Sequence, residues 1–159
     1  MSVRAAWLGL LVLLPGCASS AVDGPLPLAT DVPIQVINNM VLVGASVNGG
    51  PTAILIVDTG ASSTILTPRL LERLDVRVPA DAPRRKLTVV GGEKLSVPFI
   101  KIRTIAIGEA ILKDKEVGVY DINLGVSLPD GLLGGDILHR FRVTLDRTAR
   151  RMRLEPLGR

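Results

Sequence analysis

The sequence predicts an all-β domain, and three features of its composition and patterning point to this class. Its apolar residues are mainly Val, Ile and Leu, whereas aromatic residues make up only 3% of the chain, and a core of this kind favours sheets over helices. The 16 glycines and 11 prolines suit a protein with many turns. Short apolar or alternating runs are separated by glycine-containing turns, as in hairpins. The 159 residues give room for one such domain and little room for two.

The first 16 residues are expected to be a signal peptide. An apolar run from Trp7 to Leu14 follows Arg4, and it is too short to span a bilayer but has the length of a secretory h-region. The stretch from Leu14 to Cys17 resembles the lipobox of bacterial lipoproteins, which implies cleavage before Cys17 and a diacylglycerol on its thiol. The alternatives are an ordinary signal peptide with an incidental cysteine, or an uncleaved anchor. Each of these places the domain outside the cytoplasm.

Residues 17–31 are expected to hold the lipidated cysteine and a flexible tether, and residues 32–159 the folded domain. The segment from Ala18 to Ala29 is small, polar and rich in proline, as linkers are. Cys17 is the only cysteine, so the domain has no intrachain disulfide. Since Ala18 rather than Asp follows the cysteine, the resemblance implies a bacterial envelope lipoprotein on the periplasmic side, in the outer rather than the inner membrane.

The first half of the domain is predicted to begin with a hairpin. Strands are expected at Val41–Val47 and Thr52–Val57, joined by a turn at Asn48–Pro51. Thr67 followed by Pro68 predicts the start of a short helix, with Thr as N-cap and Pro at its first position. The buried stripe of that helix would be Leu70, Leu71 and Leu74.

Three more hairpins are predicted further along the chain. Leu87–Val90 and Glu93–Val97 would pair around Gly91 and Gly92. Phe99–Ile107 and Ile111–Tyr120 would form the next pair, and alternating residues from Val143 to Leu154 the last. Two of the hairpins lead into similar features, Ile56–Gly60 and Leu132–Gly134. We interpret this weak repeat as two units related by an approximate internal two-fold axis.

One stretch carries a candidate reactive group. The apolar run from Ala53 to Val57 leads directly into Asp58, and an ionised carboxylate at the end of a buried strand is costly unless something satisfies or uses it. Two close carboxylates that share one proton can activate a water and protonate a carbonyl oxygen, which is the chemistry of peptide hydrolysis. The simpler interpretation is an aspartate that caps a turn.

The segment Ile54–Ser62, which contains Asp58-Thr59-Gly60, resembles the active-site loop of retroviral-type (retropepsin-like) aspartic proteases when it is taken together with Gly131–Leu138. The resemblance extends over roughly residues 33–155 and is narrower to single-domain bacterial relatives. It implies a closed β-barrel or sandwich of hairpins with one or two short helices, and one active-site half per chain. It also implies an aspartic endopeptidase that needs no cofactor and no metal.

The same resemblance assigns roles to individual residues. Asp58 would be catalytic, Thr59 would lock two active-site loops together, and Gly60 would let backbone and substrate approach. Ala61 matches the retroviral side of the family. The residues that would support the loop from beneath are Leu132, Leu133 and Gly134, although a buried strand ending in a turn would look the same. Gly135 replaces a bulkier residue often found in relatives.

Gly91 and Gly92 would form the tip of a flap that closes over a peptide. The alternative is a plain hairpin without a role in binding.

A homodimer is expected because the chain has a single Asp-Thr-Gly. Asp130 and Asp136 lie near the second motif, but neither belongs to another Asp-Thr/Ser-Gly. The resemblance therefore implies a C2 dimer with Asp58 of each protomer on the axis. Val32–Ile37 and Arg151–Leu154 are the candidate interface strands, since the termini form the dimer sheet in the retroviral family.

Other classes fit the sequence less well. His139 is the only histidine, and Gly60–Thr64 lacks the second glycine of a nucleophile elbow. One His and one Cys offer little for a metal site, and Gly131–Gly135 is not followed by the Lys of a P-loop. With so few aromatic residues, nucleic acid is not an expected partner. The remaining rival is a non-catalytic, membrane-tethered peptide-binding or assembly module with the same fold.

The net charge of +4 has a local source near the C-terminus. Seven arginines lie between His139 and Arg159. They could contact anionic lipid headgroups, or they could simply cover a solvated surface strand.

Overall fold

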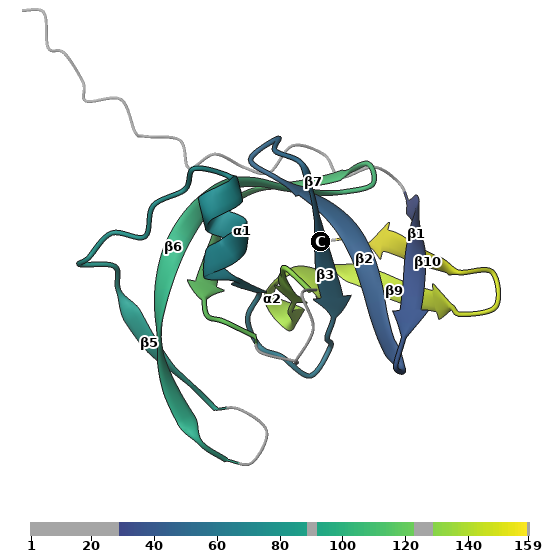
Figure 1. Ribbon diagram of the computed structural model, residues 1–159. Coiled ribbons are helices and arrows are strands. Elements are labelled where there is room, and N and C mark those ends of the chain that lie inside the picture. Colours follow the sequence, from purple (N-terminus) through teal and green to yellow (C-terminus); the bar gives the residue numbers. More distant parts are fainter. Residues whose placement is uncertain (1–28, 89–91, 123–128, 159) are drawn as a thin grey trace, which may run out of the picture.

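The computed structural model describes residues 29–88, 92–122 and 129–158 (Figure 1). The expected signal peptide, Cys17 and Gly91 lie outside the described residues. The described part is mostly β-strand with two short helices, as predicted. The strands are β1 (Thr30–Ile37), β2 (Met40–Val47), β3 (Thr52–Val57), β4 (Ile65–Leu66), β5 (Arg84–Thr88), β6 (Lys94–Ile107), β7 (Ala110–Val119), β8 (Gly131–Leu133), β9 (Phe141–Asp146) and β10 (Arg151–Pro156). The helices are α1 (Pro68–Arg73) and α2 (Gly135–Leu138).

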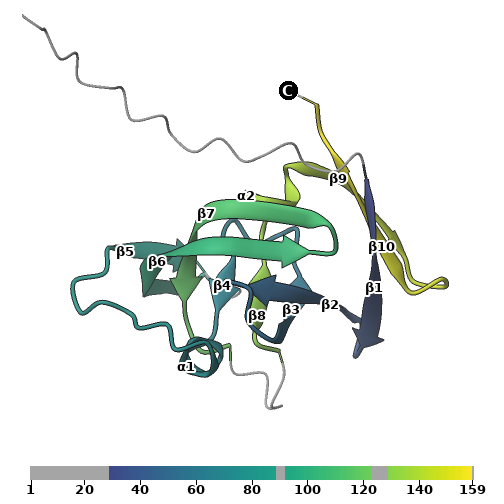
Figure 2. The ribbon, with the colours of Figure 1, turned by 90° about the horizontal axis from the view of Figure 1, so that it is seen from above.

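Six strands close into a barrel. Their order is β6-β7-β4-β8-β3-β2, and β2 pairs with β6 to complete the ring. The sheet continues beyond β2 through β1 and β10 to β9, and the other edge of β6 pairs with β5. Figure 2 shows β1, β9 and β10 side by side at one side of the barrel. The fold is thus the predicted closed barrel, extended by two arms.

The barrel consists of two units with the same layout, which confirms the predicted internal two-fold. The first unit is β2, β3, β4 and α1, and the second is β6, β7, β8 and α2. The strands β2, β3 and β4 correspond to β6, β7 and β8. The parallel pair β3–β8 therefore corresponds to the parallel pair β7–β4. The antiparallel pairs β4–β8 and β2–β6 map onto themselves and therefore lie on the axis.

Helix α1 begins as its sequence predicts. Thr67 has extended backbone angles, and its Oγ1 accepts a hydrogen bond from the backbone N–H of Leu70 (3.2 Å), as an N-cap does. Pro68 occupies the first helical position. Leu70 and Leu71 are buried in the core, while Leu74, at the C-cap, packs against it from the edge.

Several boundaries differ from the predicted ones. β6 runs without interruption through Pro98, where the sequence predicted the end of one strand and the start of another. Pro98 lies opposite Arg84 in the last described pair between β5 and β6, so its missing N–H falls where that ladder ends. β1 begins at Thr30 rather than Val32, and β5 begins at Arg84 rather than Leu87.

One hydrophobic core lies inside the barrel and beneath the β1–β10–β9 extension. It is built from Val, Ile and Leu, with Phe141 and Met152 contributed by β9 and β10. All of its buried members lie between Val32 and Leu154. Over the described residues, neither helix is long and apolar enough to cross a membrane.

Candidate active site

Asp58 lies immediately after β3, and its carboxylate is oriented by the loop that follows. The backbone N–H groups of Gly60 and Ala61 donate to Asp58 Oδ1 over 2.9 and 3.2 Å. The side chain is half-buried, and none of the ion pairs between described residues involves it. Asp58 is therefore held by neutral donors and keeps one face open, which suits a carboxylate that must exchange protons.

The loop rests on the turn between β8 and α2. The N–H of Asp58 donates to the carbonyl of Leu133 (3.0 Å), and the N–H of Gly135 donates to the carbonyl of Ala61 (2.7 Å). Leu133 and Gly134 are both buried directly beneath the loop. Leu132, the third residue expected to support the loop, is half-buried and lines the groove in front of Asp58.

Thr64 and Asp136 hold this turn in place, a structural role that was not predicted from the sequence. Thr64 is fully buried; its Oγ1 accepts from the N–H of Gly134 (3.1 Å) and donates to Asp136 Oδ1 (2.7 Å). Asp136 Oδ1 also accepts from the N–H of Ile137 (3.0 Å). The carboxylate of Asp136 is therefore used to order the start of α2, seventy-two residues from Thr64.

Close contacts with neighbouring atoms explain three glycines around the site. A Cβ on Gly60 would lie 3.3 Å from Asp58 Oδ1, and one on Gly134 would lie 2.5 Å from the carbonyl of Ser63. A Cβ on Gly135 would come within 2.7 Å of the imidazole of His139. The ring of His139 thus fills the space beside Gly135, where relatives were expected to carry a bulkier residue.

A groove with a volume of about 420 Å³ opens in front of Asp58. Its apolar walls come from Ile65, Leu87 and Leu132, and its polar rim from Ser62, Ser63 and Thr88, with Gly60 and Ala61 at its floor. Thr59 is exposed beside it. The mixture of apolar walls and backbone donors can accommodate an extended peptide.

The β5–β6 hairpin reaches this groove. Leu87 and Thr88 of β5 line it together with Asp58, and neither was singled out from the sequence, which drew attention to the two glycines alone. Gly92 has a positive φ of 83°, a conformation that glycine adopts without strain. Gly91 lies outside the described residues. The alternation of Leu87 and Leu95 with polar neighbours is the signal that could have identified the inner face.

The two-fold axis relates Asp58 to a residue without a carboxylate. Asp58 follows β3 and donates its N–H to Leu133; Tyr120 follows β7 and donates its N–H to the carbonyl of Leu66 (3.1 Å). Leu133 and Leu66 end the two strands of the antiparallel β4–β8 pair. Tyr120 therefore occupies the position equivalent to Asp58, at the other end of that pair.

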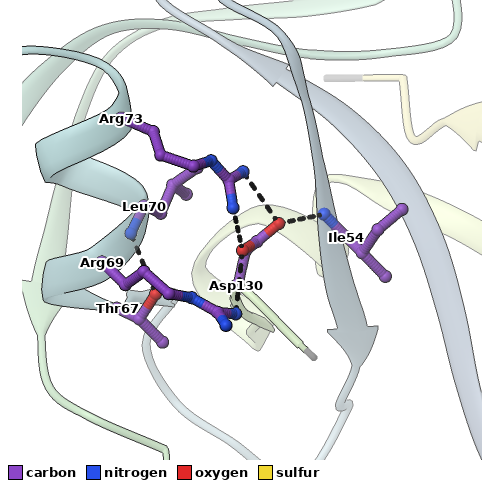
Figure 3. Close-up of polar contacts among 6 residues, drawn as sticks. All are labelled: Ile54, Thr67, Arg69, Leu70, Arg73 and Asp130. Carbon is purple, nitrogen blue, oxygen red and sulfur yellow. Dashed lines mark hydrogen bonds and ion pairs between the residues drawn. The ribbon is translucent and has the colours of Figure 1, made fainter. Parts of the chain in front are cut away.

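A second cluster, absent from the sequence-based prediction, surrounds Asp130 (Figure 3). Its carboxylate accepts from both terminal nitrogens of Arg73 (2.8 and 3.1 Å), from Arg69 (3.3 Å) and from the N–H of Ile54 (3.0 Å). The backbone of Asp130 also accepts from Thr67 and donates to Ile54. This cluster joins α1, β3 and the start of β8. Two arginines spaced four apart on a helix were the available signal, but such a pair usually covers a solvated face.

The ionisation of Asp130 follows from these contacts. Asp130 is only 1% exposed, and burial alone would raise the pKa of its carboxyl group. The hydrogen bonds from Arg73 and Ile54 and the positive charges of Arg73 and Arg69 outweigh burial and lower this pKa below the usual value. Asp130 is therefore a fixed anion with all its acceptor sites engaged, and it is unsuited to exchanging protons.

Among residues 29–88, 92–122 and 129–158, no three His, Cys, Asp or Glu side chains gather as a metal site requires.

This closed barrel, in which one Asp-Thr-Gly loop faces a groove lined by the β5–β6 hairpin, is the fold that the resemblance to retropepsin-like aspartic proteases implies. The comparison with protein families agrees: the aspartyl protease family model matches residues 43–137, and the chain belongs to that family. The fold is similar to the crystal structure of a retropepsin-like aspartic protease from Rickettsia conorii, with a TM-score of 0.60 and 21% identity over 80% of this chain and 92% of that chain. No curated protein matches the sequence.

Proposed function

We propose that this chain is an aspartic endopeptidase that acts as a C2 homodimer, with one Asp58 from each protomer. The proposal depends on one observation: Asp58 faces the groove, whereas the residue that the internal two-fold axis relates to it is Tyr120, which has no carboxylate. A single chain therefore provides one carboxylate for a reaction that uses two. The other aspartates near the second motif, Asp130 and Asp136, are bonded elsewhere.

The geometry of the loop suits a shared proton. Two Asp58 carboxylates placed close together on the dimer axis could not both ionise easily, so they would titrate as a coupled pair. The ionised member would take a proton from water while the protonated member donates to the carbonyl oxygen of the peptide. The N–H groups of Gly60 and Ala61 would keep each carboxylate oriented during this exchange. Bond cleavage needs no covalent intermediate in this scheme.

The β5–β6 hairpin would serve as the flap. Leu87 and Thr88 already line the groove, so closure of the hairpin would enclose a bound peptide between β5 and the Asp58 loop. Thr59, exposed beside the axis, would interlock with its counterpart in the partner. Val32–Ile37 and Arg151–Leu154 remain the candidate interface segments; within the chain they pair with each other through β1 and β10.

The location of the enzyme is a separate proposal that rests on the sequence. The apolar run before Cys17 supports export and a lipid anchor on the periplasmic side of the cell envelope, in the outer membrane. Metabolic labelling with a fatty acid would test it: the wild type should incorporate the label and Cys17→Ser should not. Equal labelling of the two proteins would exclude Cys17 as the attachment site.

Cleavage of a mixed peptide library tests the enzymatic proposal. Among the described residues, the buried core lies between Val32 and Leu154, so residues 18–159 contain this core and can be assayed in solution. We expect cleavage that depends on protein concentration in the range of dimerisation and that disappears in Asp58→Asn. A wild-type protein that is dimeric yet inactive from acidic to neutral pH would instead support a peptide-binding or assembly module. Cleavage that survives Asp58→Asn would refute the assignment of Asp58.

A further inference from the structure

The β9–β10 hairpin, whose arginines suggested a lipid contact from the sequence, has a neutralised outer face. Directly opposed residues of antiparallel strands share a face, so the register sets the charges against one another. Arg153 forms ion pairs with Asp31 (3.1 Å) and Glu155 (3.5 Å). Across this face, three arginines stand opposite three carboxylates: Arg142 and Glu155, Arg151 and Asp146, Arg153 and Asp31. The local net charge is zero, which favours the solvated-strand interpretation.

The flap hairpin has a different charge pattern. The register of β5 and β6 places Arg84, Lys86 and Lys94 on one face, together with Thr88 and Ser96, and all five are exposed. Arg84 donates to Oγ and the carbonyl oxygen of Ser96, which are neutral acceptors. Among the described residues of the hairpin, no carboxylate shares this face, and no ion pair involves Lys86 or Lys94.

The opposite face of the same hairpin is turned inward. Leu87 pairs with Leu95 there, and Leu87 lines the groove beside Asp58. Arg85 shares this inner face but is neutralised by Glu116 and stacks over the ring of Phe99, 4.4 Å from its centroid. Glu93, exposed next to Lys94, brings one negative charge to the described end of the hairpin, so the excess of positive charge comes from Arg84, Lys86 and Lys94 on the face opposite Leu87.

We propose that this outer face, defined by Arg84, Lys86 and Lys94, binds anionic phospholipid headgroups. Three cations in one extended face, with the hydroxyl of Ser96 among them, match a plane of lipid phosphates in charge and in hydrogen-bonding capacity. The face carries no aromatic side chain on which nucleic acid bases could stack. Twelve residues lie between Cys17 and Thr30, so a lipid on Cys17 would keep the domain within roughly 45 Å of the bilayer.

This arrangement would place the flap between the membrane and the groove. Binding through the outer face leaves Leu87 directed at the groove, so lipid contact and substrate contact would occur on opposite sides of one two-stranded ribbon. The inference concerns an interaction surface and does not depend on catalysis. Asp58→Asn should therefore bind vesicles as the wild type does.

Vesicle flotation with residues 18–159 tests the proposal without a lipid anchor. We expect the protein to float with phosphatidylcholine vesicles that contain phosphatidylglycerol, to remain unbound with phosphatidylcholine alone, and to be released by salt. Replacing Arg84, Lys86 and Lys94 with Gln should weaken binding by roughly fivefold for each charge removed, as expected for basic residues near an anionic bilayer. Lys86→Gln/Lys94→Gln should show the same trend without disturbing the Arg84–Ser96 contact.

The β9–β10 outer face provides a control with the same change in net charge. Arg142→Gln/Arg151→Gln/Arg153→Gln should bind anionic vesicles as the wild type does, while thermal unfolding verifies that each variant is folded. The proposal is overturned if both triple variants lose binding equally, because net charge alone would then explain it. It is also overturned if the wild type binds soluble poly-glutamate but neither kind of vesicle, which would indicate an acidic polypeptide as the partner.

Discussion

Asp58 and Asp130 are two aspartates next to strands of the same barrel, and their surroundings assign them opposite tasks. Asp58 receives only backbone N–H donors and opens into a groove. Asp130 is buried and bound by two arginines and a backbone N–H. The first is open to the proton exchange that its proposed role requires, whereas the second is a permanent anion that joins α1 to β3. The contrast indicates that ionic partners, more than proximity to a motif, distinguish the carboxylate proposed to react from the structural one.

The largest expected effect comes from Asp58→Asn, which should abolish activity and leave stability nearly unchanged. Asn keeps an oxygen that can accept from Gly60 and Ala61, but it cannot exchange the proton, so the rate should fall by at least about 10³-fold. Peptide cleavage and urea unfolding would be measured together. Asp75→Asn is the matched control, because Asp75 is exposed and has a positive φ of 51° that Asn tolerates. A stable, fully active Asp58→Asn would remove the contrast.

Asp130→Asn should have the opposite effect, a loss of stability with activity retained. Removing the charge leaves two arginines facing a neutral amide, but their side chains are 46% and 40% exposed and water can reach them. The loss in the free energy of unfolding should therefore be about 2–3 kcal/mol, below the cost of breaking a fully buried pair. Urea unfolding would give this value. Activity per folded molecule should remain, and its disappearance would show that Asp130 takes part in the reaction.

The pH dependence of that loss sharpens the comparison. Because the pKa of Asp130 is lowered by folding, its contribution is fully present above the unfolded value of about 3.9 and fades as the pH falls through the folded value. The difference in unfolding free energy between wild type and Asp130→Asn should thus be constant from about pH 7 to about pH 5 and shrink below about pH 4. A difference that grows on acidification would contradict the lowered pKa.

Substitution of two glycines near the site should likewise affect different properties, stability at Gly134 and activity at Gly60. In Gly134→Ala, the added Cβ would lie 2.5 Å from the backbone of Ser63, which should cost about 1–3 kcal/mol of stability. In Gly60→Ala, the Cβ would press on Asp58 Oδ1 at 3.3 Å, so activity should fall more than stability does. Unfolding and cleavage assays on both variants would show this. Equal losses of stability in the two would be the contrary outcome.

The smallest expected effect distinguishes the two arginines. Arg73 contacts both oxygens of Asp130, whereas Arg69 contacts one at 3.3 Å. Arg73→Lys cannot keep the two-point contact and should lose about 1 kcal/mol, and Arg69→Lys about half as much or less. Urea unfolding of both variants would measure the two losses, and the loss should be larger for Arg73→Lys than for Arg69→Lys.

The surroundings of Asp58 could be predicted from local sequence patterns, whereas those of Asp130 could not. The run into Asp58 and the Thr67-Pro68 helix start are both determined by near neighbours in the sequence, and the hairpins follow from alternation. The Asp130 cluster joins residues 57 and 61 positions apart, and the Thr64–Asp136 bond spans 72. Such contacts depend on how the two units fold together. The charge of the flap was missed for a similar reason, because only the strand register shows which cations lack a carboxylate opposite them.

The central claim is that each chain provides half of an active site, and mixed dimers test it most directly. Wild type and Asp58→Asn would be unfolded together in equal amounts, refolded so that protomers pair at random, and assayed for peptide cleavage. If both carboxylates are required, only dimers of two wild-type chains cleave, and activity should fall to about one quarter of that of wild type at the same total protein concentration. Activity of about one half would show that each chain works with its own Asp58, and would contradict the shared site.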